Sequence, residues 1–515
     1  MAISTLTVPA GDQPAWGQMW TRNIVSAERN LPATFDPKSG VNLKWTARLG
    51  SETHSTPVVG SGRVLIGTNN EDPRDPGHQG DRGVLMCFNE SDGRFLWQLV
   101  VPKRVEDIYF DWPKSGMSST ATIEGDRVYM VDNRGVVLCL DLAGLADGND
   151  GPFLNEGIYY APQATNTLSR GAPEAFLPDG ALRADALPPN RMEPGPLDAD
   201  ILWMFDLSSG AGIWSHDAAH SSILIRGPHL YLNTGTGVDN THRKIRTPDA
   251  PSLVVLDKAT GRLLAREREG IAPNIFHSTW APPAMATIAG RELILFAAGN
   301  GLIYAFEPLS VEAVPGEVRT LRKVWQIDFD PEAPKTEVHR FTLNKREGPS
   351  NFYGAPVCLE GRVYQAGGGD LWWGKNAAWL KCFDVSGEGD LTSKSLRWTH
   401  PLGRHTFSTA AVHDGLVYVS DCSQTLHCVD AATGQAVWTH ELQGETWASP
   451  LVADGKVFIG TRRGFHHVLA AGREKQVLAE LALGQPVSAT AVAANGVLYV
   501  ATMNQLHALA VPDRE

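Results

Sequence analysis

Short apolar runs separated by glycine turns recur along almost the whole chain. Each repeat opens on small residues and proline, continues through two alternating strands joined by a glycine turn, and closes with a third strand, an Asp and a TG-type turn before Trp. Short alternating strands joined by such turns predict antiparallel sheet. Eight openings of this kind occur, at residues 55–68, 119–132, 221–235, 283–299, 354–368, 408–438, 449–461 and 488–502.

A repeat of about 40–50 residues with four strands is typical of a propeller blade, so the eight units predict an all-β, eight-bladed β-propeller of four-stranded antiparallel blades. The last unit lacks a fourth strand, and residues 43–49, ahead of the first unit, have the pattern of that strand. We therefore expect residues 41–510 to form a ring closed by pairing this N-terminal strand with the last blade. Residues 1–40 form an extension and residues 511–515 a tail. Closure leaves no open sheet edge and favours a monomer.

The repeat resembles the pyrroloquinoline-quinone-like (PQQ-like) propeller repeat of the quinoprotein alcohol dehydrogenase-like superfamily. The STP-type entry, the GxVYVGT strand and the CxDxxTGxxxW exit at residues 428–438 carry the resemblance. It implies the fold but not the function, because the superfamily includes dehydrogenases that use the quinone, an outer-membrane assembly lipoprotein and PQQ-binding-like proteins of no established activity. The chain has no adjacent cysteines and no CxxCH, and TGxxxW is complete only at residues 433–438. PQQ is therefore the less favoured cofactor.

Composition narrows the classes of partner. Lys and Arg number 45 against 57 Asp and Glu, a net charge of −12, which argues against nucleic acid and anionic membranes. No apolar run is long enough for a membrane span. The first 16 residues have neither the basic nor the apolar region of a signal peptide. We expect a periplasmic or extracellular protein whose leader has been removed, and a cytoplasmic protein is the alternative. Four of the six cysteines recur in one strand context (LMCFN, VLCLD, LKCFD, LHCVD), which favours packing over disulfides.

One insertion, residues 143–198, interrupts the second blade between its third and fourth strands. It is rich in Pro, Gly, Ala and Asn. Within it, DGNDG at residues 147–151 has the composition of a calcium loop but lacks the ligand spacing of an EF-hand. A surface loop is the favoured interpretation.

Chemically reactive residues concentrate on one face of the predicted ring. Turns between first and second strands are short and plain, whereas the blade connections and the turns between second and third strands are long. Rigid strands that carry such loops on one face are the usual layout of a binding or catalytic site. Eight of the 16 histidines fall in these loops: His54, His78, His216, His220, His242, His277, His339 and His405.

From these loops we predict a catalytic group in which a histidine acts as base and Tyr353 as acid, with aspartates as orienting partners or hydroxyl acceptors. Its members are His54, His220, His277, Tyr353, Asp217 and Asp370. Basic and aromatic residues on the same face predict an anionic small molecule or a saccharide as ligand. The substrate-binding candidates are Asp111, Trp112, Lys114, His242, Arg243, Arg246, His339, Arg340, Trp373, Lys375, Arg404 and Trp447.

Four histidines expected to converge near the axis are candidate ligands of a divalent metal such as Ca²⁺, Zn²⁺ or Mn²⁺: His54, His220, His277 and His405. Three function classes remain open. The first is an enzyme with lyase- or hydrolase-type acid–base chemistry on a carbohydrate or other anionic substrate, with or without a metal. The second is a PQQ-dependent dehydrogenase, and the third a non-catalytic scaffold. The concentration of His, Arg and Trp favours the first.

Overall fold

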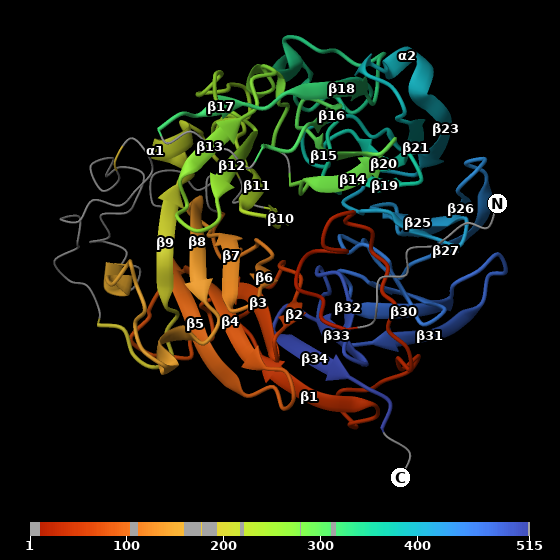
Figure 1. Cartoon of the computed structure of the whole chain (residues 1–515). Helices are drawn as coiled ribbons and strands as arrows, with labels where there is room; N and C mark the ends of the chain where they lie inside the picture. The colour runs from red at the N-terminus through yellow and green to blue at the C-terminus, as the bar shows by residue number, and fades with distance from the viewer. Residues whose placement is uncertain are drawn as a thin grey trace.

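The computed structural model describes residues 11–103, 112–158, 177, 193–216, 221–278, 280–310 and 316–512. Eight β-sheets stand around a central axis (Figure 1), which confirms the predicted eight-bladed propeller. Helices in the described residues are short: α1 (Leu207–Ala211), α2 (Thr392–Ser395) and 3-10 turns at Gly144–Ala146, Glu156–Ile158, Ala272–Asn274 and Val338–Phe341. Across the same residues, no helix has the length and apolar character that a membrane crossing requires.

Blades 1–4 follow one another along the chain, each from its inner to its outer strand. Blade 1 contains β2 (Val58–Gly60), β3 (Arg63–Asn69), β4 (Arg82–Asn89) and β5 (Phe95–Pro102). Blade 2 contains β6 (Thr122–Glu124), β7 (Arg127–Val131), β8 (Val136–Asp141) and β9 (Ile201–Asp206). Blade 3 contains β10 (Leu224–Arg226), β11 (His229–Asn233), β12 (Leu253–Asp257), β13 (Leu263–Arg266) and β17 (Arg319–Thr320). Blade 4 contains β14 (Ala284–Ile288), β15 (Arg291–Ala297), β16 (Leu302–Phe306), β18 (Lys323–Asp328) and β22 (Gly389–Asp390).

Blades 5–8 complete the ring in the same order. Blade 5 contains β19 (Val357–Leu359), β20 (Arg362–Gly368), β21 (Ala378–Asp384) and β23 (Leu396–Leu402). Blade 6 contains β24 (Ala411–His413), β25 (Leu416–Asp421), β26 (Thr425–Asp430) and β27 (Ala436–Glu441). Blade 7 contains β28 (Leu451–Ala453), β29 (Lys456–Gly460), β30 (Phe465–Ala470) and β31 (Val477–Ala482). Blade 8 contains β32 (Val492–Ala494), β33 (Val497–Ala501), β34 (Gln505–Leu509) and β1 (Leu43–Arg48).

The ring closes as the sequence predicts. Strand β1 pairs antiparallel with β34, from Leu43 opposite Leu509 to Arg48 opposite Gln505. The outermost strand of blade 8 thus comes from the start of the chain and its other three strands from the end. The first and last blades are thereby tied together, and β34 has a hydrogen-bonding partner in place of an exposed edge.

Tryptophans on the fourth strands join five of the blades to the next. Trp97 of blade 1 donates from Nε1 to the carbonyl of Leu142 in blade 2 at 2.9 Å. Its indole lies so close to Gly144 that a Cβ there would sit 2.7 Å from the ring, and Gly144 also has a positive φ, so only glycine fits. Equivalent contacts are made by Trp45, Trp203, Trp398 and Trp438.

We expect Trp97→Ala to lower the free energy of unfolding by about 3–5 kcal/mol, the usual cost of truncating a fully buried aromatic side chain. Trp97 is 1 % exposed, and the truncation would also leave the Leu142 carbonyl without its donor. Urea unfolding followed by circular dichroism measures the change. Trp20→Ala, at a tryptophan that is 53 % exposed, is the control. Equal midpoints for the two variants would refute the docking role.

The six cysteines are buried free thiols. Four of them sit directly opposite the docking tryptophans across the third and fourth strands of their blades. The cross-strand pairs are Cys87–Trp97, Cys139–Trp203, Cys382–Trp398 and Cys428–Trp438. A small side chain beside each indole leaves the ring room to lie over the next blade, so the recurrence of cysteine reflects packing.

Residues 11–31, which we call the N-terminal strap, cross the inner strands of the ring. Backbone bonds join the strap to blade 1 through Gln13 and Val59, to blade 4 through Trp20 and Met285, and to blade 7 at Val452. At its turn, Arg22 is fully buried and donates to the carbonyls of Trp16 and Pro283. Burial lowers the pKa of Arg22 to about 9. The strap therefore ties together the inner strands of blades 1, 4 and 7.

Buried histidines make the fold sensitive to acid. Burial lowers the pKa of His466 to about 3 and the pKa values of His467 and His507 to about 4, whereas an unfolded histidine titrates near 6.5. Below pH 6.5 the unfolded chain takes up protons that the native protein refuses until about pH 4. The unfolded state is therefore favoured as the pH falls through this window.

Each of these histidines is expected to lower the free energy of unfolding by about 1.4 kcal/mol per pH unit between pH 6.5 and 4. Urea unfolding at pH 7 and at pH 5 measures the loss. His507→Gln should reduce the difference between the two pH values, whereas His413→Gln, at a histidine whose side chain is 39 % exposed, should leave it unchanged. A pH-independent midpoint would contradict this prediction.

Candidate functional site

A cavity of about 550 Å³ lies on the axis of the ring, and all eight blade connections contribute to its wall. Three of the turns between second and third strands add to it, so the cavity opens on the face where the reactive loops gather. Its lining residues are Trp16, Glu52, His54, Thr56, Trp112, Ser115, Ser118, Thr120, Ser221, Ser222, His242, His277, Trp280, Pro282, Tyr353, Trp372, Trp373, Phe407, Trp447, Arg462 and Ser488.

Aromatic rings form one continuous wall of this cavity. The ring centroid of Tyr353 lies 4.9 Å from that of Trp280 and 4.5 Å from that of Phe407. The ring centroids of Phe407 and Trp447 are 4.9 Å apart. Flat apolar faces of this kind bind the apolar face of a sugar ring or an aromatic ring, while nearby hydroxyls bind its polar edge. Serines and threonines from the starts of the inner strands supply such hydroxyls, and Trp16 of the strap lines the cavity with them.

Three buried histidines meet at the side of the cavity. His216 comes from the connection into blade 3, His242 from the loop between β11 and β12, and His277 from the connection into blade 4. The Nε2 atom of His216 lies 3.2 Å from Nε2 of His242 and 3.0 Å from Nε2 of His277. His242 and His277 line the cavity, so this three-histidine centre faces any ligand that enters.

Asp370 holds His277 in the orientation that this convergence needs. Its Oδ2 accepts from Nδ1–H of His277 at 2.7 Å and from the hydroxyl of Tyr353, while Oδ1 accepts from the backbone N–H groups of Trp372 and Trp373. Burial would raise the pKa of Asp370, but the charge and hydrogen bond of His277 and the Tyr353 hydroxyl outweigh it and hold the pKa at about 2. With Nδ1 protonated, the Nε2 lone pair of His277 points toward the other two histidines.

This donor set fits a divalent transition metal. Nitrogen atoms at about 2.0–2.1 Å from one tetrahedral Zn²⁺ lie about 3.3 Å apart, close to the two Nε2 separations from His216, and the ligand atoms of all three histidines lie within 4.8 Å of one another. A carboxylate that accepts from the far nitrogen of a ligating histidine is the usual second layer of such sites. Three protein ligands leave one coordination position for water or substrate, the arrangement of catalytic rather than structural zinc.

A second histidine group, on the outer part of blades 6 and 7, is better explained as packing. His440 and His467 lie 3.1 Å apart, with Glu480 3.6 Å from each. The same pairing recurs one blade earlier, where His400 lies 3.2 Å from His427. A contact repeated between successive blades follows from the sequence repeat, and we assign it a structural role.

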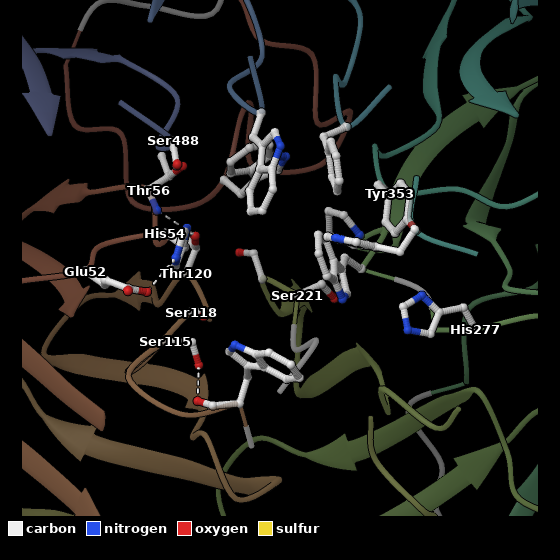
Figure 2. Close-up of a pocket in the computed structure, with 18 of the residues that line it drawn as sticks. Glu52, His54, Thr56, Ser115, Ser118, Thr120, Ser221, His277, Tyr353 and Ser488 are labelled. Carbon is white, nitrogen blue, oxygen red and sulfur yellow. Dashed lines mark hydrogen bonds and ion pairs between the residues drawn. The ribbon is translucent and has the colours of Figure 1, made fainter. Parts of the chain in front are cut away.

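Seven of the predicted site residues line the cavity, and Asp370 lies directly behind its wall. In Figure 2, Glu52 and His54 lie on one side, and Tyr353 and His277 on the other. His54 is 3.5 Å from Glu52 and its ring is 5.8 Å from Trp447, so it stands across the cavity from the three-histidine centre. The seven are His54, Trp112, His242, His277, Tyr353, Trp373 and Trp447.

The predicted basic residues do not gather in the cavity. Lys375 forms a buried ion pair with Asp330, and Arg246 lies 3.9 Å over the ring of Trp214. The others outside the lining are Lys114, Arg243, His339, Arg340 and Arg404. Of the described residues, Arg462 is the one lysine or arginine that lines the cavity, where it lies 3.8 Å over the ring of Trp447.

The predicted metal ligands also need revision. His54 lies across the cavity from His277, and His405 is buried with its Nε2 bonded to the carbonyl of Lys375 at 2.9 Å. The structure places His216 and His242 beside His277 instead. Sequence reasoning included His242 among substrate-binding residues and noted His216 only as a loop histidine. The remaining predicted residues, Asp111, Asp217 and His220, lie outside the described residues.

Comparisons with known proteins agree with the fold. The sequence profile of the family described as outer membrane protein assembly factor BamB matches residues 21–149 and 361–476. BamB from Moraxella catarrhalis is similar in structure, with a TM-score of 0.51 at 11 % identity over 91 % of this chain and 97 % of that one. The quinohemoprotein alcohol dehydrogenase of Comamonas testosteroni gives a TM-score of 0.44 at 14 % identity over 99 % of this chain and 82 % of that one. No curated protein matched the sequence.

The eight-bladed ring, and the profile match over residues 21–149 and 361–476, are consistent with a PQQ-like β-propeller. PQQ itself fits the cavity poorly. A flat tricarboxylate needs several cations, and Arg462 is the one lysine or arginine among the described lining residues. All six cysteines are buried thiols and none are adjacent, so the cavity has no vicinal disulfide to face a quinone.

Proposed function

We propose that this propeller is a metal-dependent enzyme that acts on a small ring-bearing polar molecule of the carbohydrate class by acid–base chemistry. The observation that carries the proposal is the meeting of three histidine Nε2 atoms in the wall of an aromatic-lined axial cavity. A divalent metal there would polarise a substrate oxygen or activate a bound water. The aromatic wall would hold the ring of the substrate beside it.

His54 is the proposed proton-transfer group on the opposite wall. Glu52 lies 3.5 Å from its Nε2, and a carboxylate in this position orients an imidazole for proton transfer. The side chain of His54 is 20 % exposed, so it can exchange protons with solvent or substrate. His54 would supply the base, and the proposed metal on the facing wall the electrophilic site, of a lyase- or hydrolase-type reaction.

The anionic character proposed for the substrate rests on two positive groups in the cavity. Arg462 and the proposed metal would each bind a carboxylate, while Glu52 would repel one placed near His54. A uronate bound with its carboxylate toward the metal or Arg462 satisfies this arrangement. We propose an exported, periplasmic or extracellular location on the profile match to an outer-membrane assembly factor.

Metal uptake by the purified chain tests this function. Protein dialysed against a chelator should bind one equivalent of Co²⁺ in the axial cavity, with the intense visible absorption of tetrahedral cobalt, and Zn²⁺ should displace it. Turnover of neutral and uronate oligosaccharides is then compared with and without metal. Absence of cobalt absorption would overturn the metal centre. Metal binding without saccharide binding would overturn the substrate class and favour a non-catalytic scaffold.

A further inference from the structure

The start of the blade 2 insertion contains a second site, separate from the axial cavity. Residues 147–156 follow β8 and lie against the residues that lead into β9, where the carbonyl of Asp198 accepts from Leu145 and that of Leu202 accepts from Phe153. None of the residues discussed here lines the axial cavity. Any ligand of this region would therefore act independently of the three-histidine centre.

Two carboxylates in this region are completely buried. Glu156 and Asp200 both have 0 % exposure. One oxygen of each is hydrogen-bonded, whereas Oε1 of Glu156 and Oδ1 of Asp200 are buried without a hydrogen-bonding partner. Leaving one buried polar atom unsatisfied is costly, and two in neighbouring carboxylates indicate a missing partner.

Neighbouring residues of one loop tie the two carboxylates together. The side-chain amide of Asn149 donates to Oε2 of Glu156 at 2.7 Å, and the backbone N–H of Asp150 donates to Oδ2 of Asp200 at 3.1 Å. Asn149 and Asp150 are consecutive residues, so one loop contacts both carboxylates, and the charge of Asp200 acts on Glu156.

Among the described residues, no basic side chain compensates the charge of these carboxylates. No lysine, arginine or histidine of the described chain lies within 4.0 Å of the carboxylates of Asp147, Asp150, Glu156 or Asp200. Burial raises the pKa of Glu156, and the charge of Asp200 raises it further. Burial also raises the pKa of Asp200, with added repulsion from Asp141, Asp150 and Asp147.

We propose that Glu156, Asp200 and the loop at residues 147–150 bind a calcium ion, which fastens residues 147–156 to blade 2. The free oxygens Oε1 of Glu156 and Oδ1 of Asp200 would be two of its ligands, and the side-chain and carbonyl oxygens of the loop would supply others. Ca²⁺ takes 6–8 oxygen ligands in flexible geometry, and this region offers only oxygen donors around the two carboxylates.

Protonation alone does not resolve the two free oxygens. A neutral carboxylic acid carries an O–H that must itself find an acceptor. A divalent cation satisfies both oxygens and offsets the charges of Glu156 and Asp200 together. The sequence pattern at residues 147–151 does not follow the EF-hand, because two of the ligands come from outside the loop.

The test measures Ca²⁺ binding to the intact chain after chelation. Isothermal titration with CaCl₂ should show one site, and added Ca²⁺ should raise the thermal midpoint by mass action. Glu156→Gln and Asp200→Asn should each lower Ca²⁺ affinity by about tenfold or more. Without Ca²⁺ they should not lower the thermal midpoint, because each removes a buried negative charge. Asp126→Asn, at a carboxylate of blade 2 whose side chain is 77 % exposed, is the control.

A structural role for the carboxylates predicts the opposite pattern: the two variants would melt lower without Ca²⁺, and CaCl₂ would change nothing. That result, or equal affinity for Mg²⁺, would overturn the assignment. His242→Gln should leave the Ca²⁺ isotherm unchanged, and Glu156→Gln should leave cobalt uptake unchanged. The calcium site and the proposed metalloenzyme can therefore fail independently of each other.

Discussion

Deletion of residues 1–50 is expected to abolish the cooperative thermal transition of the ring. The deletion removes β1, which pairs with β34 along its length in blade 8. Trp45 of β1, whose indole donates to the carbonyl of Glu90 in blade 1, is lost with it. It also removes the strap that is bonded to the inner strands. The edge of β34 would then be open and ready to pair with another chain.

Circular dichroism on heating should show the loss of the single sharp transition, and gel filtration should show aggregates. A matched control separates the contributions of β1 and the strap. The N–H of Ala510 donates to the carbonyl of Asn42, so the two ends of this blade are adjacent. Residues 43–50 transferred to the C-terminus through a short hairpin should restore the ring. If the truncated chain melts like the intact one, closure does not stabilise the fold.

His277→Ala is expected to abolish metal uptake in the axial cavity. It removes one of three nitrogen ligands and also leaves Asp370 buried without its histidine partner. Two histidines cannot hold a tetrahedral metal at the affinity of three. Asp370→Asn keeps all three ligands but removes the charge that orients His277, and we expect about 10–100-fold weaker binding.

Competition with a chromophoric chelator measures both affinities, and thermal unfolding checks that each variant is folded. His440→Gln, in the histidine pair between blades 6 and 7, is the control and should keep full metal affinity. Full Co²⁺ uptake by the His277 variant would remove the basis of the proposed centre. Loss of uptake in the His440 variant alone would show that the metal binds at the histidine pair between blades 6 and 7.

The fold could be predicted because it is repeated. Eight copies of one strand pattern specify eight blades, and the missing strand at the C-terminal end requires one from residues 43–49. The Cys–Trp pairs, such as Cys87 opposite Trp97, recur for the same reason. The same local packing requirement acts in every blade, so the same residue pattern recurs along the sequence and can be recognised.

The face that bears the cavity also followed from the sequence, because strand direction alone decides which loops share a face. The pairing of side chains within those loops did not. Lys375 was expected at the ligand but forms an ion pair with Asp330 of the connection into blade 5, and His405 is bonded to a backbone carbonyl. Such choices depend on which partner is nearer in space, and no local pattern records them.

Sequence by itself determined the eight blades, the closing strand and the reactive face, since these follow from hydrophobic periodicity and chain direction. Tertiary structure alone decided that His216, His242 and His277 converge, although they are separated by 26 and 61 positions. It likewise decided that Glu156 and Asp200 are buried with unbonded oxygens. Long loops hold these side chains, and a loop has no periodicity from which the direction of its side chains can be read.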